Sequence, residues 1–232
     1  MDQHLNAYGD VARPTEAGHG MDIASQRADE LDLLAIEQVR TLVSRGDAKG
    51  AVLALDIGCG HGGQAARMAQ AGAQVLAIDV EDCADKVAAS MRAQGVARAA
   101  WAFRRIGIEQ IGSVDLQADV IVCQRMIHYL RHGDALAALT ALRRAAAASA
   151  ALYLSASGMD SELADGYTGR GVDVRERFAT LSVDRACKHQ IALPVCLYRE
   201  EELADLARAA GWRVRRVFRS SFGNVKLVAT RG

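Results

Sequence analysis

The chain has 232 residues, of which 50% are hydrophobic, 24% charged and 5% aromatic, which suits one globular α/β domain with a modest appendage. Basic and acidic residues number 28 each, and this zero formal charge makes nucleic acid an unlikely partner. Five irregularly spaced cysteines without a C-x-x-C pair predict neither disulfides nor a metal site. No apolar run is long enough for a membrane span and the N-terminus does not resemble a signal peptide, so we expect a cytoplasmic protein.

The first 49 residues are predicted to form an N-terminal arm and a helical lid. Residues 1 to about 20 are polar and contain glycines, a proline and two histidines, which favours an irregular arm. Between Met21 and Ser44 the apolar residues recur at helical spacing, which predicts one or two helices. The glycines at 46 and 50 then mark the turn into a second region, residues 50–232.

Predicted strands and helices alternate after that turn. The strands are Ala51–Ile57, Gln74–Val80, Ala99–Ile106, Asp119–Gln124 and Ala150–Ala156. The intervening helices or turns are Gly62–Gln70, Asp82–Gln94 with Asp82 as its N-cap, Glu109–Ser113 and Asp134–Ala148. Such alternation, with strands that are almost continuously apolar, favours a parallel sheet covered on both faces.

The C-terminal part departs from the alternation. An insertion of mixed polarity, at about residues 158–198, precedes a helix that has an acidic first turn, Glu200–Glu202, and ends at Gly211. Two further predicted strands, Arg213–Arg219 and Asn224–Thr230, are joined by a short turn and must therefore be antiparallel.

The most informative motif is Asp56-Ile-Gly-Cys-Gly-His-Gly62, at the end of the first predicted strand. Glycines there allow a ligand close to the backbone, and Asp79 ends the next strand at the interval expected of a carboxylate that binds a ribose. Gly58, Gly60 and Gly63 also satisfy the dinucleotide spacing, so an NAD-linked oxidoreductase is an alternative. Asp56 argues against it, because a carboxylate repels a pyrophosphate but attracts an ammonium group.

This motif resembles the first motif of class I S-adenosylmethionine-dependent methyltransferases, in their small-molecule branch. The ending helix–Ala-Gly-Trp–strand–turn–strand is also similar to that family, so the resemblance covers about residues 50–232 apart from the insertion. It implies a Rossmann-like α/β fold with a seven-stranded, mostly parallel sheet and an antiparallel C-terminal strand. It also implies S-adenosylmethionine as the methyl donor.

The resemblance assigns the cofactor site residue by residue. Asp79 is expected at the ribose and Val80 at the adenine, while the acid that many members use at the adenine edge is missing unless Glu109 takes its place. The expected cofactor-binding residues are Asp56, Gly58, Cys59, Gly60, Gly62, Asp79, Val80, Ile106, Gly107, Cys123 and Gln124.

The expected chemistry is an in-line displacement at the sulfonium methyl, with release of S-adenosylhomocysteine and a small molecule as acceptor. Alignment dominates such a reaction, and a base is needed only where the acceptor must lose a proton. His128 is the candidate base and His189 a second one, whereas Cys123 is expected to be a buried thiol. Candidate lid residues are His4, Tyr8, His19 and Arg27.

Two alternatives stay open beside the small-molecule enzyme. The arginine-rich segment Trp212–Arg219 is a possible docking face of an RNA or protein methyltransferase, although a solvated strand face is the simpler interpretation. A protein that binds S-adenosylmethionine without transferring its methyl group is the other.

Overall fold

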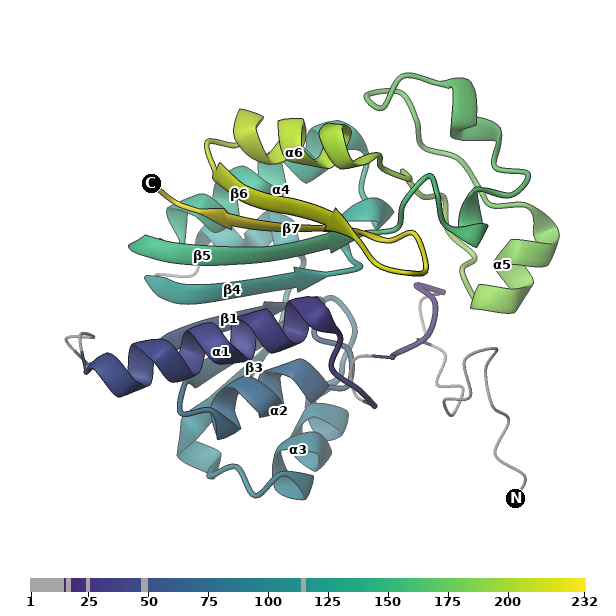
Figure 1. The fold of residues 1–232 in the computed structure, drawn as a ribbon. Helices are drawn as coiled ribbons and strands as arrows, with labels where there is room; N and C mark the ends of the chain where they lie inside the picture. Colours follow the sequence, from purple (N-terminus) through teal and green to yellow (C-terminus); the bar gives the residue numbers. More distant parts are fainter. Residues whose placement is uncertain (1–14, 16–17, 24–25, 47–49, 114–115) are drawn as a thin grey trace, which may run out of the picture.

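The computed structural model describes residues 15, 18–23, 26–46, 50–113 and 116–232 (Figure 1). The lid candidates His4 and Tyr8 lie outside these residues. The helices are α1 (Glu30–Arg45), α2 (Gly63–Gln70), α3 (Ala84–Ala93), α4 (His132–Arg144), α5 (Val183–His189) and α6 (Glu200–Ala209). The strands are β1 (Leu53–Ile57), β2 (Gln74–Asp79), β3 (Trp101–Arg105), β4 (Ala118–Gln124), β5 (Ala146–Ala156), β6 (Arg213–Arg219) and β7 (Val225–Thr230).

All seven strands form one sheet in the order β3-β2-β1-β4-β5-β7-β6. Strands β1 to β5 are parallel to one another, and β7 is antiparallel to both β5 and β6. Ile57 at the end of β1 lies level with Ile78 of β2 and Cys123 of β4, so the loops that follow these strands share one edge of the sheet. The predicted fold class is confirmed.

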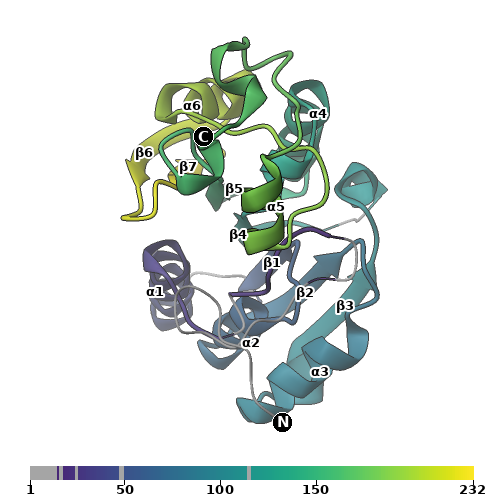
Figure 2. The same ribbon diagram turned by 90° about the vertical axis from the view of Figure 1, so that its right-hand side faces the viewer.

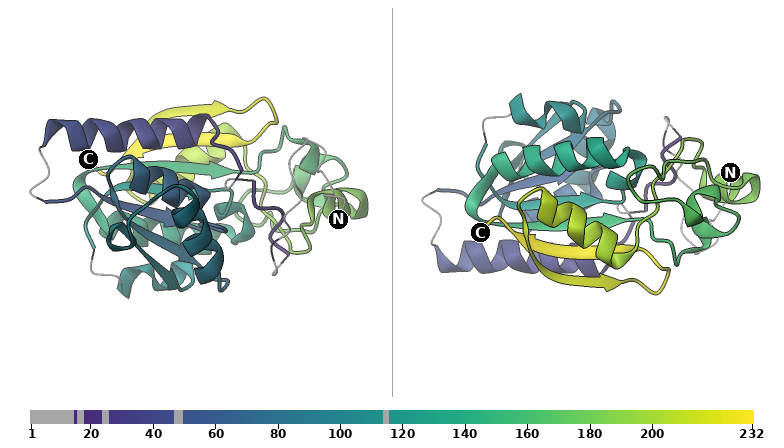
Figure 3. Two further views of the ribbon diagram at one scale, coloured as in Figure 1. Left: turned by 90° about the horizontal axis from the view of Figure 1, so that it is seen from below. Right: turned by 90° about the horizontal axis from the view of Figure 1, so that it is seen from above.

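Two hydrophobic cores cover the two faces of the sheet. Helices α1, α2 and α3 pack on one face, and α4 and α6 pack on the other (Figure 3). The central strand β4 serves both cores because its side chains alternate: Ile121 and Cys123 belong to one core, Val120 and Val122 to the other. A strand buried on both faces explains the apolar run in the sequence.

The element boundaries differ from the predictions at three places. Helix α4 ends at Arg144 and β5 begins at Ala146, so the helix predicted to run to Ala148 was too long. Alanines favour a helix locally, but here Ala146 pairs with Ala118 of β4. The N-cap of α3 is Cys83, and the side chain of Asp82, the predicted cap, accepts a bond from the Ala84 N–H at 3.4 Å.

The third difference is in the helical region predicted from Met21: among the described residues, its helix, α1, begins at Glu30. A capping box sets this start: Asp29 accepts bonds from the backbone of Leu31 and Asp32, and Asp32 accepts one from the backbone N–H of Asp29. Residues 18–23, which we call the strap, are not helical and run across the carboxyl-end edge of the sheet (Figure 1).

The insertion has a small core of its own, built around Leu163, Tyr167 and Leu197. It lies beyond the carboxyl ends of the strands, with α5 facing the strap (Figure 2). Two backbone hydrogen bonds join insertion and strap: Gly20 N–H donates to the carbonyl of Gln190 at 3.0 Å, and Ala192 N–H to that of Gly18 at 3.0 Å. Within the described parts of the chain, no helix has the length and apolarity required to cross a bilayer.

Candidate active site

The turn after β1 has the tight geometry that its glycines predict. Gly58, Gly60 and Gly62 have φ angles of 69°, 51° and 78°, in the left-handed region that favours glycine. The N–H groups of Gly58 and Cys59 donate to the carbonyl of Ile78 in β2 at 2.9 and 3.0 Å, which anchors the turn. A Cβ on Gly58 would lie 2.9 Å from the Met126 side chain, so there is no space for one.

Asp79 holds this turn from the end of β2. One carboxylate oxygen accepts a bond from Gly60 N–H at 2.9 Å and the other accepts one from Glu81 N–H at 3.0 Å. Each oxygen retains a further lone pair for a ribose hydroxyl. Val80, the expected adenine contact, is 55% exposed and lines the same cavity.

A cavity of about 740 Å³ opens at this edge of the sheet. Its wall includes most of the expected cofactor residues, namely Asp56, Gly58, Cys59, Gly60, Asp79, Val80, Ile106, Gly107 and Gln124. Gly62 and Cys123 lie behind that wall: Gly62 faces Val87 of α3, and Cys123 is fully buried in the core. Burial, with Asp56 nearby, raises the pKa of the Cys123 thiol to about 12, which fits the expectation of an inert thiol.

Glu109 folds back onto the loop after β3, where the sequence lacks the acid that the resemblance leads us to expect. It lines the cavity, and its carboxylate lies so close to Gly107 that a Cβ there would be 2.1 Å from Oε1. Gly107 is therefore needed for this carboxylate to fold back onto the loop after β3. The arrangement offers an acceptor where the adenine edge is expected.

Buried carboxylates surround the glycine turn. Burial, together with Asp32 and Asp79, raises the pKa of Asp56 to about 8, and burial with Asp29 raises that of Asp32 to about 6. The Asp56 Oδ2 atom has no hydrogen-bond partner among the described residues. A glycine cradle without space for side chains, and a buried carboxylate with one oxygen that has no partner, fit the methionine end of S-adenosylmethionine, which carries an ammonium group.

Several residues of the cavity wall were not predicted from the sequence, among them Asp22, Asp32 and Glu81. Gln124 donates a hydrogen bond from its side chain to Asp32 Oδ1, and Ser155 Oγ donates to Gln124 Oε1 at 3.2 Å. Asp22 of the strap lies 3.1 Å from His61 Nδ1, and Glu81 lies 3.4 Å from His19 Nδ1. The capping-box spacing of Asp29 and Asp32 was the only sequence signal that could have revealed one of them.

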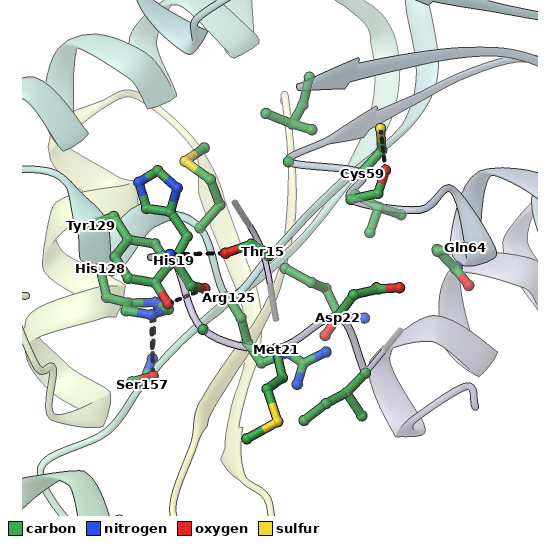
Figure 4. A pocket seen from close by; sticks show the side chains of 18 of the residues that line it. Thr15, His19, Met21, Asp22, Cys59, Gln64, Arg125, His128, Tyr129 and Ser157 are labelled. Carbon is green, nitrogen blue, oxygen red and sulfur yellow. Dashed lines mark hydrogen bonds between the residues drawn. The ribbon is translucent and has the colours of Figure 1, made fainter. Parts of the chain in front are cut away.

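His128, the candidate base, lines the cavity but is only 1% exposed. Its ring contacts Ser157: the backbone N–H lies 3.4 Å from Nδ1 and the hydroxyl 3.3 Å from Nε2 (Figure 4). Burial, with Arg125 and His19, lowers its pKa to about 3, so the ring is neutral at physiological pH. The second candidate, His189, lies 2.7 Å from Glu162 in the insertion and also lines the cavity.

The other candidates lie at the strap and at its approach to α1. His19 packs edge-on against Tyr129, with ring centroids 4.7 Å apart, and its carbonyl accepts a bond from the Tyr129 hydroxyl at 2.5 Å. Arg27 is exposed at the cavity rim.

No group of three or more side chains suited to a metal ion occurs among the residues that the structure describes.

A known protein family matches the part of the chain that contains the glycine turn. Residues 54–148, which contain the glycine turn, Asp79 and the end of β4, match the family model described as a methyltransferase domain. No curated protein sequence matches the chain.

Solved structures share the fold at low sequence identity. Magnesium protoporphyrin IX methyltransferase from Synechocystis PCC 6803, with bound S-adenosylhomocysteine, aligns with a TM-score of 0.62 and 18% identity, over 100% of this chain and 90% of that one. The 1,6-didemethyltoxoflavin N1-methyltransferase from Burkholderia thailandensis aligns with a TM-score of 0.58 and 16% identity, over 84% and 77%. An O-methyltransferase family protein from Burkholderia thailandensis gives 0.61 and 16%, over 87% and 56%.

The fold and the family match define the class: a Rossmann-like chain that carries a methyltransferase domain at residues 54–148. Solved structures with this fold hold S-adenosylhomocysteine or S-adenosylmethionine, the donor that the sequence resemblance implies for this site. The NAD alternative is thereby set aside.

Proposed function

We propose that the enzyme transfers the methyl group of S-adenosylmethionine to a small-molecule acceptor. The observation that carries this proposal is the cavity, which reaches from the glycine turn to the insertion and the β6–β7 hairpin. The strap crosses it, paired with the cofactor loops on one side and hydrogen-bonded to the insertion on the other. A macromolecular acceptor would have to displace this cover, whereas a small molecule fits beneath it.

The relatives support the same acceptor class. Two of the structures with this fold are named for small acceptors, magnesium protoporphyrin IX and 1,6-didemethyltoxoflavin. The alternative of an RNA or protein substrate rests on the arginines of β6. Two of these already have partners on the chain: Arg219 pairs with Asp160, and Arg216 stacks on Phe218 at 4.3 Å.

The bound donor supplies an electrophilic methyl group on a sulfonium, and the chain mainly aligns the acceptor with it. The residues around the end of β4 and the insertion would position the acceptor. Where the acceptor is a hydroxyl, His128 is the proposed proton acceptor because it is neutral and lies in the wall. Its low pKa makes it a weak base, so we assign the larger share of the rate to alignment.

The test uses donor labelled in its methyl group and a size-fractionated extract of the source cells. Label is expected in the small-molecule fraction, with an equal amount of S-adenosylhomocysteine released. Label in RNA or protein would overturn the proposed acceptor class, and cofactor binding without turnover in any fraction would support a non-catalytic binder.

The role of His128 is tested with the acceptor found in that way. The variant His128→Asn preserves a hydrogen-bonding side chain beside Ser157 but cannot accept a proton as imidazole does. For a hydroxyl acceptor, kcat is expected to fall roughly 100-fold or more, with donor affinity unchanged. An unchanged kcat would exclude His128 as the base and leave alignment as the mechanism.

A further inference from the structure

We propose that Arg125 binds the carboxylate of the methionine half of S-adenosylmethionine, while the neighbouring buried carboxylates bind its ammonium group. The amino-acid end of the donor carries both charges, and the glycine turn with Asp56 accounts for only one of them. The inference rests on the identity of the donor and is independent of the acceptor.

Arg125 is the best-placed cation of the cavity wall, because Arg27, the other arginine of that wall, is exposed. Lys226 is buried, and its Nζ lies 2.9 Å from Asp29 Oδ2 and also pairs with Glu30. The histidines at 19, 61 and 189 each lie against a carboxylate. Within the described part of the chain, no hydrogen bond or ion pair is made by the Arg125 guanidinium, which extends into the cavity (Figure 4).

The backbone of Arg125 is held in a strained conformation. Its φ angle is 49°, in the left-handed region that residues other than glycine seldom adopt. Two hydrogen bonds from its N–H, to the carbonyl and to the hydroxyl of Ser155, both at 3.0 Å, fix this conformation. Strain of this kind concentrates at ligand-binding sites, where it aims a side chain.

The residues next to Arg125 show which part of the cavity its side chain faces. Met126 packs against Gly58, so Arg125 follows β4 directly beside the glycine turn. Arg125, Asp29 and Asp32 line the same cavity, and Gln124, next to Arg125 in the chain, donates a side-chain hydrogen bond to Asp32 Oδ1 at the start of α1. A cation and the buried carboxylate of Asp56, whose Oδ2 atom has no partner among the described residues, line the same cavity and form a complementary site for a zwitterion.

The experiment compares two ligands that differ only in the carboxylate: S-adenosylmethionine and decarboxylated S-adenosylmethionine. Calorimetric affinities are measured for the full chain and for Arg125→Gln. We expect the variant to bind S-adenosylmethionine on the order of 10- to 100-fold more weakly and the decarboxylated ligand as the unaltered chain does. Arg131→Gln is the matched control, since Arg131 stacks on Phe178 outside the cavity wall, and both affinities should stay unchanged.

A second variant separates binding from folding. Arg125→Gly removes the guanidinium and also relieves the left-handed strain, so it should lose the same carboxylate-dependent affinity without a fall in melting temperature. Equal losses for both ligands would overturn the proposal, because Arg125 would then act only on the shape or charge of the wall. No loss in Arg125→Gln, or a carboxylate-dependent loss confined to Arg27→Gln, would overturn it as well.

Discussion

Buried charges are arranged differently in two regions of the molecule, the glycine-turn end of the cavity and the insertion. Around the turn, carboxylates lie near one another, and the pKa values of Asp32 and Asp56 are raised. In the insertion, opposite charges are paired: Arg177, 3% exposed, makes two hydrogen bonds to the Glu202 carboxylate at 2.7 and 2.9 Å, and the pKa of Glu202 is lowered.

The difference separates a binding surface from a supporting one. Like charges that are buried together destabilise the folded protein until a cation arrives, so their presence indicates a ligand. A buried pair with complete hydrogen bonding fixes geometry instead: Arg177 also donates to the carbonyls of Gly169, Val172 and Leu197, which ties the insertion to α6. The insertion thereby presents its side of the cavity at a constant position.

The largest effect is expected from breaking the buried pair. Arg177→Ala removes the buried cationic partner of Glu202, which keeps its bonds from the more exposed Arg199, and should lower the free energy of unfolding by about 3–5 kcal/mol in urea denaturation. Arg185→Ala, which removes a more exposed arginine paired with Asp165 and Glu162, should cost at most about 1 kcal/mol. Similar losses for the two variants would show that Arg177 does not anchor the insertion.

A substitution of Asp79 tests the ribose contact that is expected at the cofactor end of the cavity. Asp79→Ala should weaken S-adenosylhomocysteine binding by roughly 1–3 kcal/mol, because bonds to a charged acceptor are lost. Asp82→Ala removes an exposed carboxylate three residues along the chain and serves as the control, with affinity unchanged in the same calorimetric titration. Unchanged affinity in Asp79→Ala would move the ribose away from β2.

The smallest effect is a pH dependence from Asp56. A ligand ammonium favours the carboxylate form, and the pKa of Asp56 in the free protein is about 8. Affinity for S-adenosylhomocysteine should therefore rise between pH 6 and 7.5, by up to about tenfold per pH unit. Asp56→Asn should bind more weakly at pH 7.5 and lose most of this slope; a slope that persists would assign the proton to another group.

The raised pKa of Asp56 also affects the stability of the free protein, which should fall as the pH rises, whereas the ligand affinity should increase. Because the pKa of Asp56 is raised above its ordinary value, the folded chain binds more protons than the unfolded chain between about pH 4 and 8. The contribution of Asp56 to stability is therefore greatest at low pH and is lost as the pH rises toward 8. Asp56→Asn should melt at a higher temperature than the unaltered chain at pH 8 without ligand.

The sequence alone determined the alternation of strands and helices, the glycine turn and the positions of Asp56 and Asp79. These features depend on local rules: apolar periodicity, the left-handed φ angles that only glycine adopts cheaply, and the short distance along the chain from β1 to the end of β2. The α4–β5 boundary was missed because pairing with β4 overrides the helical preference of alanine.

Tertiary structure decided which distant residues complete the site. Asp32 reaches Gln124 across 92 positions of sequence, and Lys226 reaches Glu30 across 196, and neither pairing has a local signal. The left-handed turn at Arg125 depends on Ser155 in the neighbouring strand, and the cover of the cavity depends on strap residues meeting the insertion. Burial sets the pKa values of Asp56 and His128, and burial exists only once the sheet, helices and strap have packed together.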